Sequence, residues 1–336
     1  MRAIFCLFFI YFISPIYTYI MRIALCGALG KMGREVFDYC QDTKDIDVVL
    51  FVDKLFDGTI LQAKTPQKQR LSDAKNYVNF YDKNFAFDCS KNGIETVCNI
   101  DDAQCDFDAI IDFSSHNATI SILKTAIVRR CSVVLATTGH TEVEKKYIEY
   151  ASQFIPLFYA NNMSLGIAVL AKCIKETLSV FNRSNTISDG VCRTDNNELK
   201  RLDAQNFEKS EQLDAENRDN FKGIDVEIIE THHTQKADVP SGTALMLAAA
   251  VKNSIGGQIV VGRHENGKKK EGDIGVHSLR MGSVFGQHEV RINTSEEVMT
   301  FTHEALSRKV YAKGAIEAVR YLKSQSAGLY GIDDLL

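Results

Sequence analysis

The 336-residue sequence has no tryptophan, only four prolines and no excess of basic side chains. Its 39 lysines and arginines are balanced by 43 acidic residues, and the pI is about 6.1. Nucleic-acid-binding domains normally carry a basic surface, so a nucleic-acid partner is not indicated. The nine cysteines are scattered without a Cys-x-x-Cys pair, which argues against a disulfide framework or a zinc knuckle. The pattern predicts an intracellular protein in which most cysteines are small buried side chains.

What is present is an ordinary globular composition, with 45% apolar and 24% charged residues. The length favours two domains, each able to bury its own core. From Met21 onward, short apolar segments alternate with helical patterns, which predicts βαβ units and a parallel sheet. The expected strands cover residues 23–26, 47–52, 107–113, 132–136 and 156–159, and the first helix extends to residue 39.

After residue 162 the pattern changes, because strands follow one another without helices between them. Such a succession predicts an antiparallel or mixed sheet. Helices are expected over residues 164–181, 242–253 and 307–324, and strands over 224–230, 258–261, 276–280, 287–293 and 297–302. The fold class is therefore α/β, with a parallel-sheet domain followed by a domain built on a mixed sheet. The last helix could return to either domain.

Two segments lie outside this scheme. Residues 1–20 are apolar nearly throughout and resemble a secretory segment or a membrane anchor. No small-x-small cleavage site follows and Pro15 interrupts the run, so we favour a start codon placed too far upstream, with Met21 as the natural start. An anchor or targeting peptide is the alternative. Residues 194–222 are mostly polar and charged, which predicts a solvated, mobile insertion rather than a partner-binding segment.

A glycine-rich loop, Gly27-x-x-Gly30-x-x-Gly33, lies between the first strand and its helix. Glycines there allow a tight turn and close approach to a pyrophosphate at the helix N-terminus. Asp53 ends the second strand 20 residues beyond Gly33, where an acid binds the ribose hydroxyls. Lys54 could instead attract a 2′-phosphate, so NADH and NADPH are both open. Packing glycines and an ordinary strand-end carboxylate are the alternatives.

The sequence Ala-Thr-Thr-Gly at residues 136–139 follows another expected strand. Open α/β sheets bind ligands at the carboxyl ends of their strands. Small residues with hydroxyls and free N–H groups suit a nicotinamide amide, and an ordinary turn is the alternative reading.

Residues 230–244, Glu-Thr-His-His-Thr-Gln-Lys-Ala-Asp-Val-Pro-Ser-Gly-Thr-Ala, form the most informative stretch. Adjacent histidines at the end of a strand point to opposite sides, so both cannot easily pack in a core. Ser241 can cap the apolar helix that follows, and its first amides are anion donors. Zinc is the rival reading, but no third ligand accompanies the pair. The stretch predicts a proton donor beside a carboxylate-binding site, formed by His232, His233, Lys236, Gly242 and Thr243.

Taken in order from Met21 to Leu336, these motifs resemble 4-hydroxy-tetrahydrodipicolinate (dihydrodipicolinate) reductases of the diaminopimelate route to lysine. The N-terminal motifs are Gly27-x-x-Gly-x-Met-Gly33, Thr137-Thr-Gly139 and Ala160-Asn-Asn-Met163. The most specific is His232-His-x-x-Lys236-x-Asp-x-Pro-Ser-Gly-Thr243. The C-terminal motifs are Ile274-Gly-x-His-Ser-x-Arg280, Gly286-x-His288, Thr302-His-x-Ala-x-Ser-Arg308 and Gly328-Leu-Tyr-x-x-x-Asp-x-Leu336.

The resemblance implies a Rossmann-type dinucleotide-binding domain over residues 21–163, to which residues 308–336 return. Residues 164–307 would form an α+β substrate-binding and tetramerisation domain on an open mixed sheet. The implied enzyme is a cytoplasmic, metal-free homotetramer that reduces a cyclic imine dicarboxylate with NADH or NADPH and releases water. Membrane contact is expected only if residues 1–20 are retained.

The resemblance also implies residue roles. His232 would be the proton donor and acceptor and Lys236 a second proton donor. The substrate would be held by His233, Gly242 and Thr243. The dinucleotide would contact Gly27, Ala28, Leu29, Gly30, Lys31, Met32, Asp53 and Lys54. The nicotinamide would be lined by Ala136, Thr137, Thr138, Ala160, Asn161, Asn162 and Met163.

Three positions depart from the family pattern. Ala136 stands where glycine is usual, Met163 where an aromatic residue is common, and Val239 where alanine is frequent.

Two rival functions would account for the glycine loop but not for the other motifs. A dehydrogenase of similar plan acting on an amino or keto acid would not need the complete His-His-x-x-Lys motif, and a non-catalytic dinucleotide sensor would need no acid–base pair.

Overall fold

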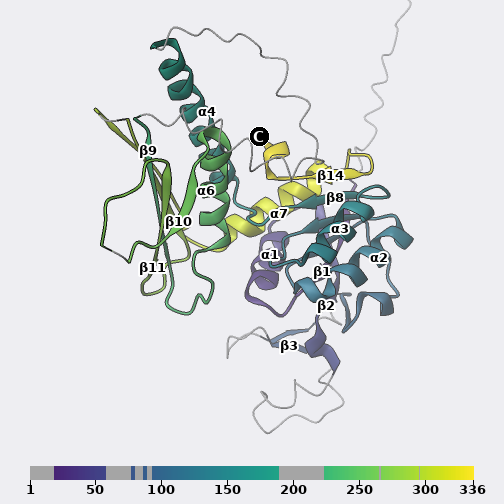
Figure 1. Ribbon diagram of the computed structural model, residues 1–336. Helices are drawn as coiled ribbons and strands as arrows, with labels where there is room; N and C mark the ends of the chain where they lie inside the picture. Colours follow the sequence, from purple (N-terminus) through teal and green to yellow (C-terminus); the bar gives the residue numbers. More distant parts are fainter. Residues whose placement is uncertain are drawn as a thin grey trace, which may run out of the picture.

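Two separate sheets organise the chain in the computed structural model (Figure 1), which describes residues 19–57, 77–79, 86–88, 93–188, 223–264, 266–294 and 296–336. The expected insertion at 194–222 and residues 1–18 of the apolar N-terminal segment lie outside these ranges. Within them, no helix has the length and apolar character needed to cross a membrane.

The first sheet has seven strands in the order β14-β8-β7-β6-β1-β2-β5, and every neighbouring pair is parallel. This arrangement confirms the predicted Rossmann-type sheet. Its strands are β1 (Met21–Cys26), β2 (Ile46–Val52), β5 (Glu95–Val97), β6 (Ala109–Asp112), β7 (Ser132–Leu135), β8 (Pro156–Tyr159) and β14 (Gly328–Tyr330). A separate antiparallel pair, β3 (Tyr77–Asn79) and β4 (Ala86–Asp88), was not expected.

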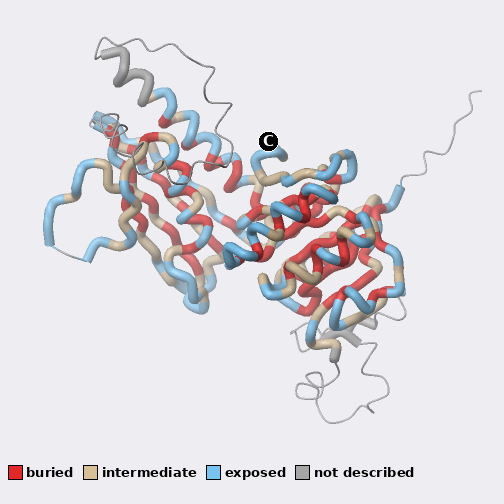
Figure 2. Tube along the Cα trace, turned by 45° about the vertical axis from the view of Figure 1, so that its right-hand side comes forward, coloured by how far each residue is buried: buried red, intermediate tan, exposed pale blue. Residues whose placement is uncertain are grey.

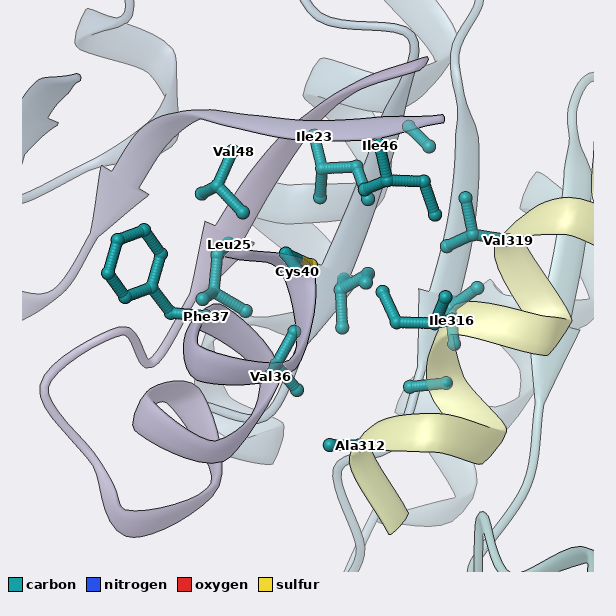
Figure 3. Close-up of a cluster of buried hydrophobic side chains, with 14 of the residues drawn as sticks. Ile23, Leu25, Val36, Phe37, Cys40, Ile46, Val48, Ala312, Ile316 and Val319 are labelled. Atoms are coloured by element: carbon teal, nitrogen blue, oxygen red, sulfur yellow. The ribbon is translucent and has the colours of Figure 1, made fainter. Parts of the chain in front are cut away.

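Helices cover both faces of this sheet, which is why its strands are continuous apolar runs. On one face lie α1 (Lys31–Gln41) and α7 (Lys309–Leu322), and on the other α2 (Thr119–Arg129) and α3 (Glu142–Ala151). Figure 3 shows the first core, where side chains of β1 and β2 meet those of α1 and α7. Alternate residues of β1 enter the two cores, Ile23 on the α1 side and Ala24 on the α2 side.

Gly27 is required by the turn between β1 and α1. Its φ is +77°, and a Cβ there would lie 2.7 Å from the carbonyl oxygen of Phe113. Gly33 is equally constrained, because a Cβ there would lie 2.3 Å from the carbonyl oxygen of Gly27. The first and third glycines therefore bring α1 close to the strand ends.

We expect Gly27→Ala to lower the free energy of unfolding by about 3 kcal/mol. Alanine would be strained by the left-handed backbone, and its methyl group would overlap the carbonyl of Phe113. The matched control is Gly93→Ala, because Gly93 has a similar φ of +68° but open space around it among the described residues. The control carries only the backbone cost, about 1 kcal/mol. Urea unfolding of both variants measures the difference, and equal losses would contradict the close approach.

The second sheet has the order β10-β11-β9-β12-β13. Its β10-β11-β9 half is parallel and its β9-β12-β13 half antiparallel, as expected for a mixed sheet. The strands are β9 (Asp225–His232), β10 (Gln258–Val261), β11 (Asp273–Arg280), β12 (Gln287–Asn293) and β13 (Val298–Glu304). One face packs on α4 (Leu165–Ser188) and α6 (Gly242–Ile255), and Figure 2 shows the buried residues gathered there.

The end of the chain returns to the first sheet. Helix α7 lies against α1, and β14 pairs with β8 to form one edge of the sheet. Arg320 of α7 forms an ion pair with Asp45 at 2.8 Å. A Cβ at Gly314 would lie only 1.6 Å from the carbonyl oxygen of Met163, so α7 also fixes the segment that leads into α4.

Candidate active site

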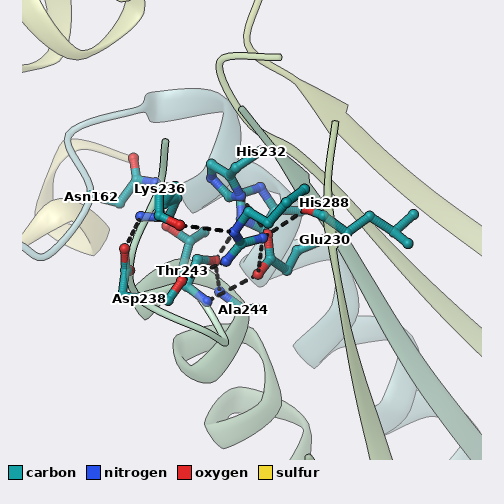
Figure 4. Close-up of polar contacts among 11 residues, drawn as sticks. Asn162, Glu230, His232, Lys236, Asp238, Thr243, Ala244 and His288 are labelled. Atoms are coloured by element: carbon teal, nitrogen blue, oxygen red, sulfur yellow. Dashed lines mark hydrogen bonds and ion pairs between the residues drawn. The ribbon is translucent and has the colours of Figure 1, made fainter. Parts of the chain in front are cut away.

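A buried carboxylate–histidine pair lies at the end of β9. Glu230 and His232 are two residues apart on one strand, so both side chains are on the same side, and they are 0% and 6% exposed. Nδ1 of His232 is hydrogen-bonded to Oε2 of Glu230 (Figure 4). The Glu230 carboxylate also accepts from Arg280 Nη1 at 3.0 Å and from the Ser241 N–H at 3.2 Å.

These donors keep Glu230 ionised. Burial raises the pKa of the Glu230 carboxyl, but hydrogen bonds from His232 and Arg280 outweigh burial and lower it to about 2. A carboxylate is only an acceptor, so Nδ1 of His232 carries the proton in this contact. The other ring nitrogen, Nε2, takes no part in this contact and is 3.0 Å from the position of a Cβ at Gly286.

His288 of β12 supports the same pair from the neighbouring strand. It is 2% exposed, and its ring centroid lies 5.2 Å from that of His232. Its Nε2 lies 3.3 Å from the hydroxyl of Ser241, and within the described ranges its Nδ1 has no hydrogen-bond partner. Burial and the nearby His232 lower the pKa of His288 to about 3, so this imidazole is neutral.

Lys236 lies on the loop that follows β9. Its Nζ forms an ion pair with Asp238 at 2.8 Å, a partner that the sequence did not indicate. Arg280 donates to the backbone carbonyls of both residues while it binds Glu230. One guanidinium therefore joins the loop of Lys236 to the carboxylate under His232.

The N-terminus of α6 completes this part of the site. Ser241 caps the helix by accepting from the Ala244 N–H at 3.2 Å, as its sequence position predicted. Gly242 is exposed, whereas Thr243 is 9% exposed. The Thr243 hydroxyl accepts a hydrogen bond of 2.7 Å from the side-chain amide of Asn162. This bond joins the segment expected at the nicotinamide to the segment expected at the substrate.

The glycine loop and Asp53 also lie together. Asp53 accepts from the backbone N–H groups of Leu29 and Leu55, each at 3.1 Å. In the described chain no side chain caps α1 at Gly30, and its first turn holds no acidic residue. Its N–H groups are therefore available to an anion. Among the other expected cofactor residues, Lys31, Lys54 and Asn161 are exposed, Met32 is half-buried, and the side chains of Ala28, Leu29, Ala160 and Met163 are buried.

A cavity of about 300 Å³ opens where β6 and β7 end. Three of its lining residues, Ala136, Thr137 and Thr138, were expected there from the sequence. Four others were missed, and their signal is that they directly follow a buried strand at the same sheet edge: Phe113, Ser114, Ser115 and His116. His116 Nδ1 lies 3.0 Å from the carboxylate of Glu144 of α3, within hydrogen-bonding distance.

Positively charged side chains lie near His233. Burial and the charges of Arg308 and Lys31 lower the pKa of His233. Lys31 belongs to the first domain's α1, so cationic groups from distant parts of the chain act on one histidine. Arg308 also stacks on Phe285 at 5.0 Å and was not assigned a role from the sequence.

A Rossmann-type sheet with an open helix N-terminus, together with a buried carboxylate–histidine pair, is typical of an NAD(P)-dependent oxidoreductase. Comparison with known families narrows this class. The family model "Dihydrodipicolinate reductase, N-terminus" matches residues 21–163, and "Dihydrodipicolinate reductase, C-terminus" matches residues 211–336. The chain belongs to the dihydrodipicolinate reductase family, which confirms the resemblance seen in the sequence.

Individual relatives match two thirds or more of the chain. The 4-hydroxy-tetrahydrodipicolinate reductase of Caldanaerobacter subterraneus subsp. tengcongensis is 31% identical over 319 residues, covering 94% of this chain and 98% of the relative. That of Exiguobacterium sibiricum is 34% identical over 229 residues, covering 68% and 76%. A solved dipicolinate-bound dihydrodipicolinate reductase from Paenisporosarcina sp. TG-14 has a TM-score of 0.61 at 18% identity, covering 94% of this chain and all of that one.

Proposed function

We propose that this site reduces 4-hydroxy-tetrahydrodipicolinate to tetrahydrodipicolinate with NADH or NADPH and releases water, in the diaminopimelate route to lysine. Family membership supports the reaction. The observation that carries the proposal is the hydrogen bond between Asn162 and Thr243. It connects the end of the dinucleotide-binding half to the helix N-terminus beside His232 and Lys236.

The residues present fit a dinucleotide. Gly27 and Gly33 leave no room for side chains beside the loop, and the uncapped α1 N-terminus would hold the pyrophosphate. Asp53 would bind the adenosine ribose, and Thr137 and Thr138 would line the nicotinamide in the cavity at the ends of β6 and β7. When bound, the cofactor supplies a hydride to C4 of the substrate.

The chain's own residues then bind the dicarboxylate and supply protons. The substrate carboxylates would be held by the amides of Gly242 and Thr243 and by the ammonium of Lys236. To bind a carboxylate, Lys236 would leave its ion pair with Asp238. His233 would add a further contact. The 4-hydroxyl leaves as water, C4 gains a hydride, and one proton balances the reaction. Nε2 of His232 donates that proton, and Lys236 polarises the imine.

The test is turnover. The substrate is made in situ from pyruvate and aspartate semialdehyde by the preceding synthase, and oxidation of NADH and of NADPH is followed by absorbance. We expect substrate-dependent oxidation of the cofactor. A preference for NADH would indicate that Asp53 governs cofactor choice, and a preference for NADPH would indicate Lys54. Folded protein that binds NADH but oxidises neither cofactor would contradict the proposal and favour a sensor or another substrate.

We further infer a cytoplasmic homotetramer. Residues 21–163 with 308–336 would form the dinucleotide domain, and residues 164–307 the assembly domain. The support is the face of the second sheet turned away from α4 and α6, where Leu279 and Val298 are 53% and 57% exposed. Sedimentation equilibrium tests the assembly, since a monomeric mass at micromolar concentration would contradict it.

A further inference from the structure

The buried carboxylate under His232 has no role in the function proposed so far. We propose that Glu230 is a positioning residue: it fixes the proton of His232 on Nδ1, presents Nε2 to the substrate as the acid, and stabilises the imidazolium form. Arg280 holds Glu230 in place and couples it to the loop of Lys236. This inference rests on the proposed function, because it deepens the role of His232 within it.

The first support is the completeness of the carboxylate's contacts. Glu230 is fully buried, and a buried charge is retained only when it is paired and hydrogen-bonded. Its Oε2 faces His232 Nδ1, its Oε1 accepts from the Ser241 N–H, and both oxygens lie 3.0 Å from Arg280 Nη1. Such a carboxylate cannot turn away from the imidazole without breaking the contacts with β11 and with the α6 cap.

The second support is the direction of the free nitrogen. With Nδ1 engaged, only Nε2 can exchange a proton with a ligand, because the two ring nitrogens are distinct. Gly286 has no side chain in front of that atom, and a Cβ there would lie 3.0 Å from it. Glu230 and Gly286 therefore act from opposite sides of one ring, one holding Nδ1 and the other leaving Nε2 open.

The third support is the charge balance around the ring. Glu230 is the carboxylate in contact with His232, and the groups that face it from neighbouring elements are cationic, neutral or phenolic. These groups are Arg280 of β11, His288 of β12, His233 and Lys236 of the following loop, and Tyr311 of α7. Without Glu230, a protonated His232 would face cationic and neutral groups and no carboxylate among them, so the carboxylate is what favours the imidazolium form.

The fourth support is the shared guanidinium. Arg280 Nε donates to the carbonyl of Lys236 at 3.3 Å, and its Nη2 donates to the carbonyl of Asp238. The same side chain binds Glu230. Both groups assigned to proton donation are thus positioned through one Arg280–Glu230 ion pair.

The test variant is Glu230→Gln, which keeps the shape and removes the charge. We expect kcat to fall at least about tenfold with little change in the KM for NADH. The high-pH limb of kcat should move to lower pH, because the protonated imidazole loses the negative charge that contacts it. In a His232→Gln background the same change should add no further loss, since Glu230 acts through His232.

The matched control is Glu227→Gln. Glu227 lies on the same strand and binds another histidine, His277, at 2.7 Å, but on the opposite face of the sheet. The control should keep the parent's pH limb once sedimentation shows the same assembly. A purely structural Glu230 would lower stability but leave the kcat and the high-pH limb of Glu230→Gln as in the parent, which would overturn the inference.

A second measurement needs neither substrate nor a Glu230 variant. In the ¹⁵N-histidine spectrum of the complete parent protein, the His232 signals are identified by their absence in His232→Gln. We expect the neutral ring to carry its proton on Nδ1, which contacts Glu230. A neutral ring with its proton on Nε2 would overturn the inference even if turnover is normal. Absence of turnover in the parent would instead contradict the proposed function and leave this result to be judged separately.

Discussion

His232→Gln is expected to reduce kcat about a hundredfold to ten-thousandfold, the range attributed to a positioned general acid. Glutamine retains a polar group near Glu230 and Arg280 but cannot deliver a proton from Nε2. Binding of NADH should change little, because the dinucleotide loop lies on the other sheet. The measurement is steady-state oxidation of the reduced cofactor with substrate made in situ, together with fluorescence titration of NADH.

The control for this variant is His264→Gln, an exposed histidine on the loop after β10. It should retain parental kcat, which shows that loss of a histidine alone is harmless. A His232→Gln enzyme within about threefold of the parent would remove His232 from the role of acid, since general acids contribute far more than that.

Lys236→Ala is expected to damage both binding and turnover, with kcat/KM for the substrate lower by about a hundredfold or more. The ammonium is the flexible cation of the site, and loss of one preformed electrostatic donor typically costs this much. The effect should be on the KM for the dicarboxylate as well as on kcat, because the same group binds a carboxylate and polarises the imine. Steady-state kinetics with varied substrate separates the two parameters.

Asp238→Asn separates loss of the ammonium from loss of the ion pair. It removes the partner of Lys236 at 2.8 Å and keeps the lysine. Because Asp238 is exposed, its ion pair with Lys236 contributes little free energy, and kcat/KM should stay within about fivefold of the parent. Unaltered kinetics in Lys236→Ala would reject its role, and equal losses in both variants would assign the effect to the loop's ion pair.

Several elements were predictable because their signal is local. The strands Pro156–Tyr159, Gln258–Val261 and Gln287–Asn293 have the bounds that the apolar runs and alternation indicated. Others were missed because they are three residues long. β5 and β14 are strands only because β2 and β8 offer free edges, and such short segments carry no periodicity of their own.

The candidate site divides in the same way. The sequence by itself determined the glycine loop, the Ser241 cap and the spacing from His232 to Thr243, because each is a short motif whose geometry follows from one strand, turn or helix. Only the tertiary structure decided that Arg280 binds Glu230, that His288 packs on His232 and that Asn162 meets Thr243. The physical reason is that periodicity specifies which face of an element is buried, whereas its partner is chosen by strand pairing and helix packing between segments far apart in the chain.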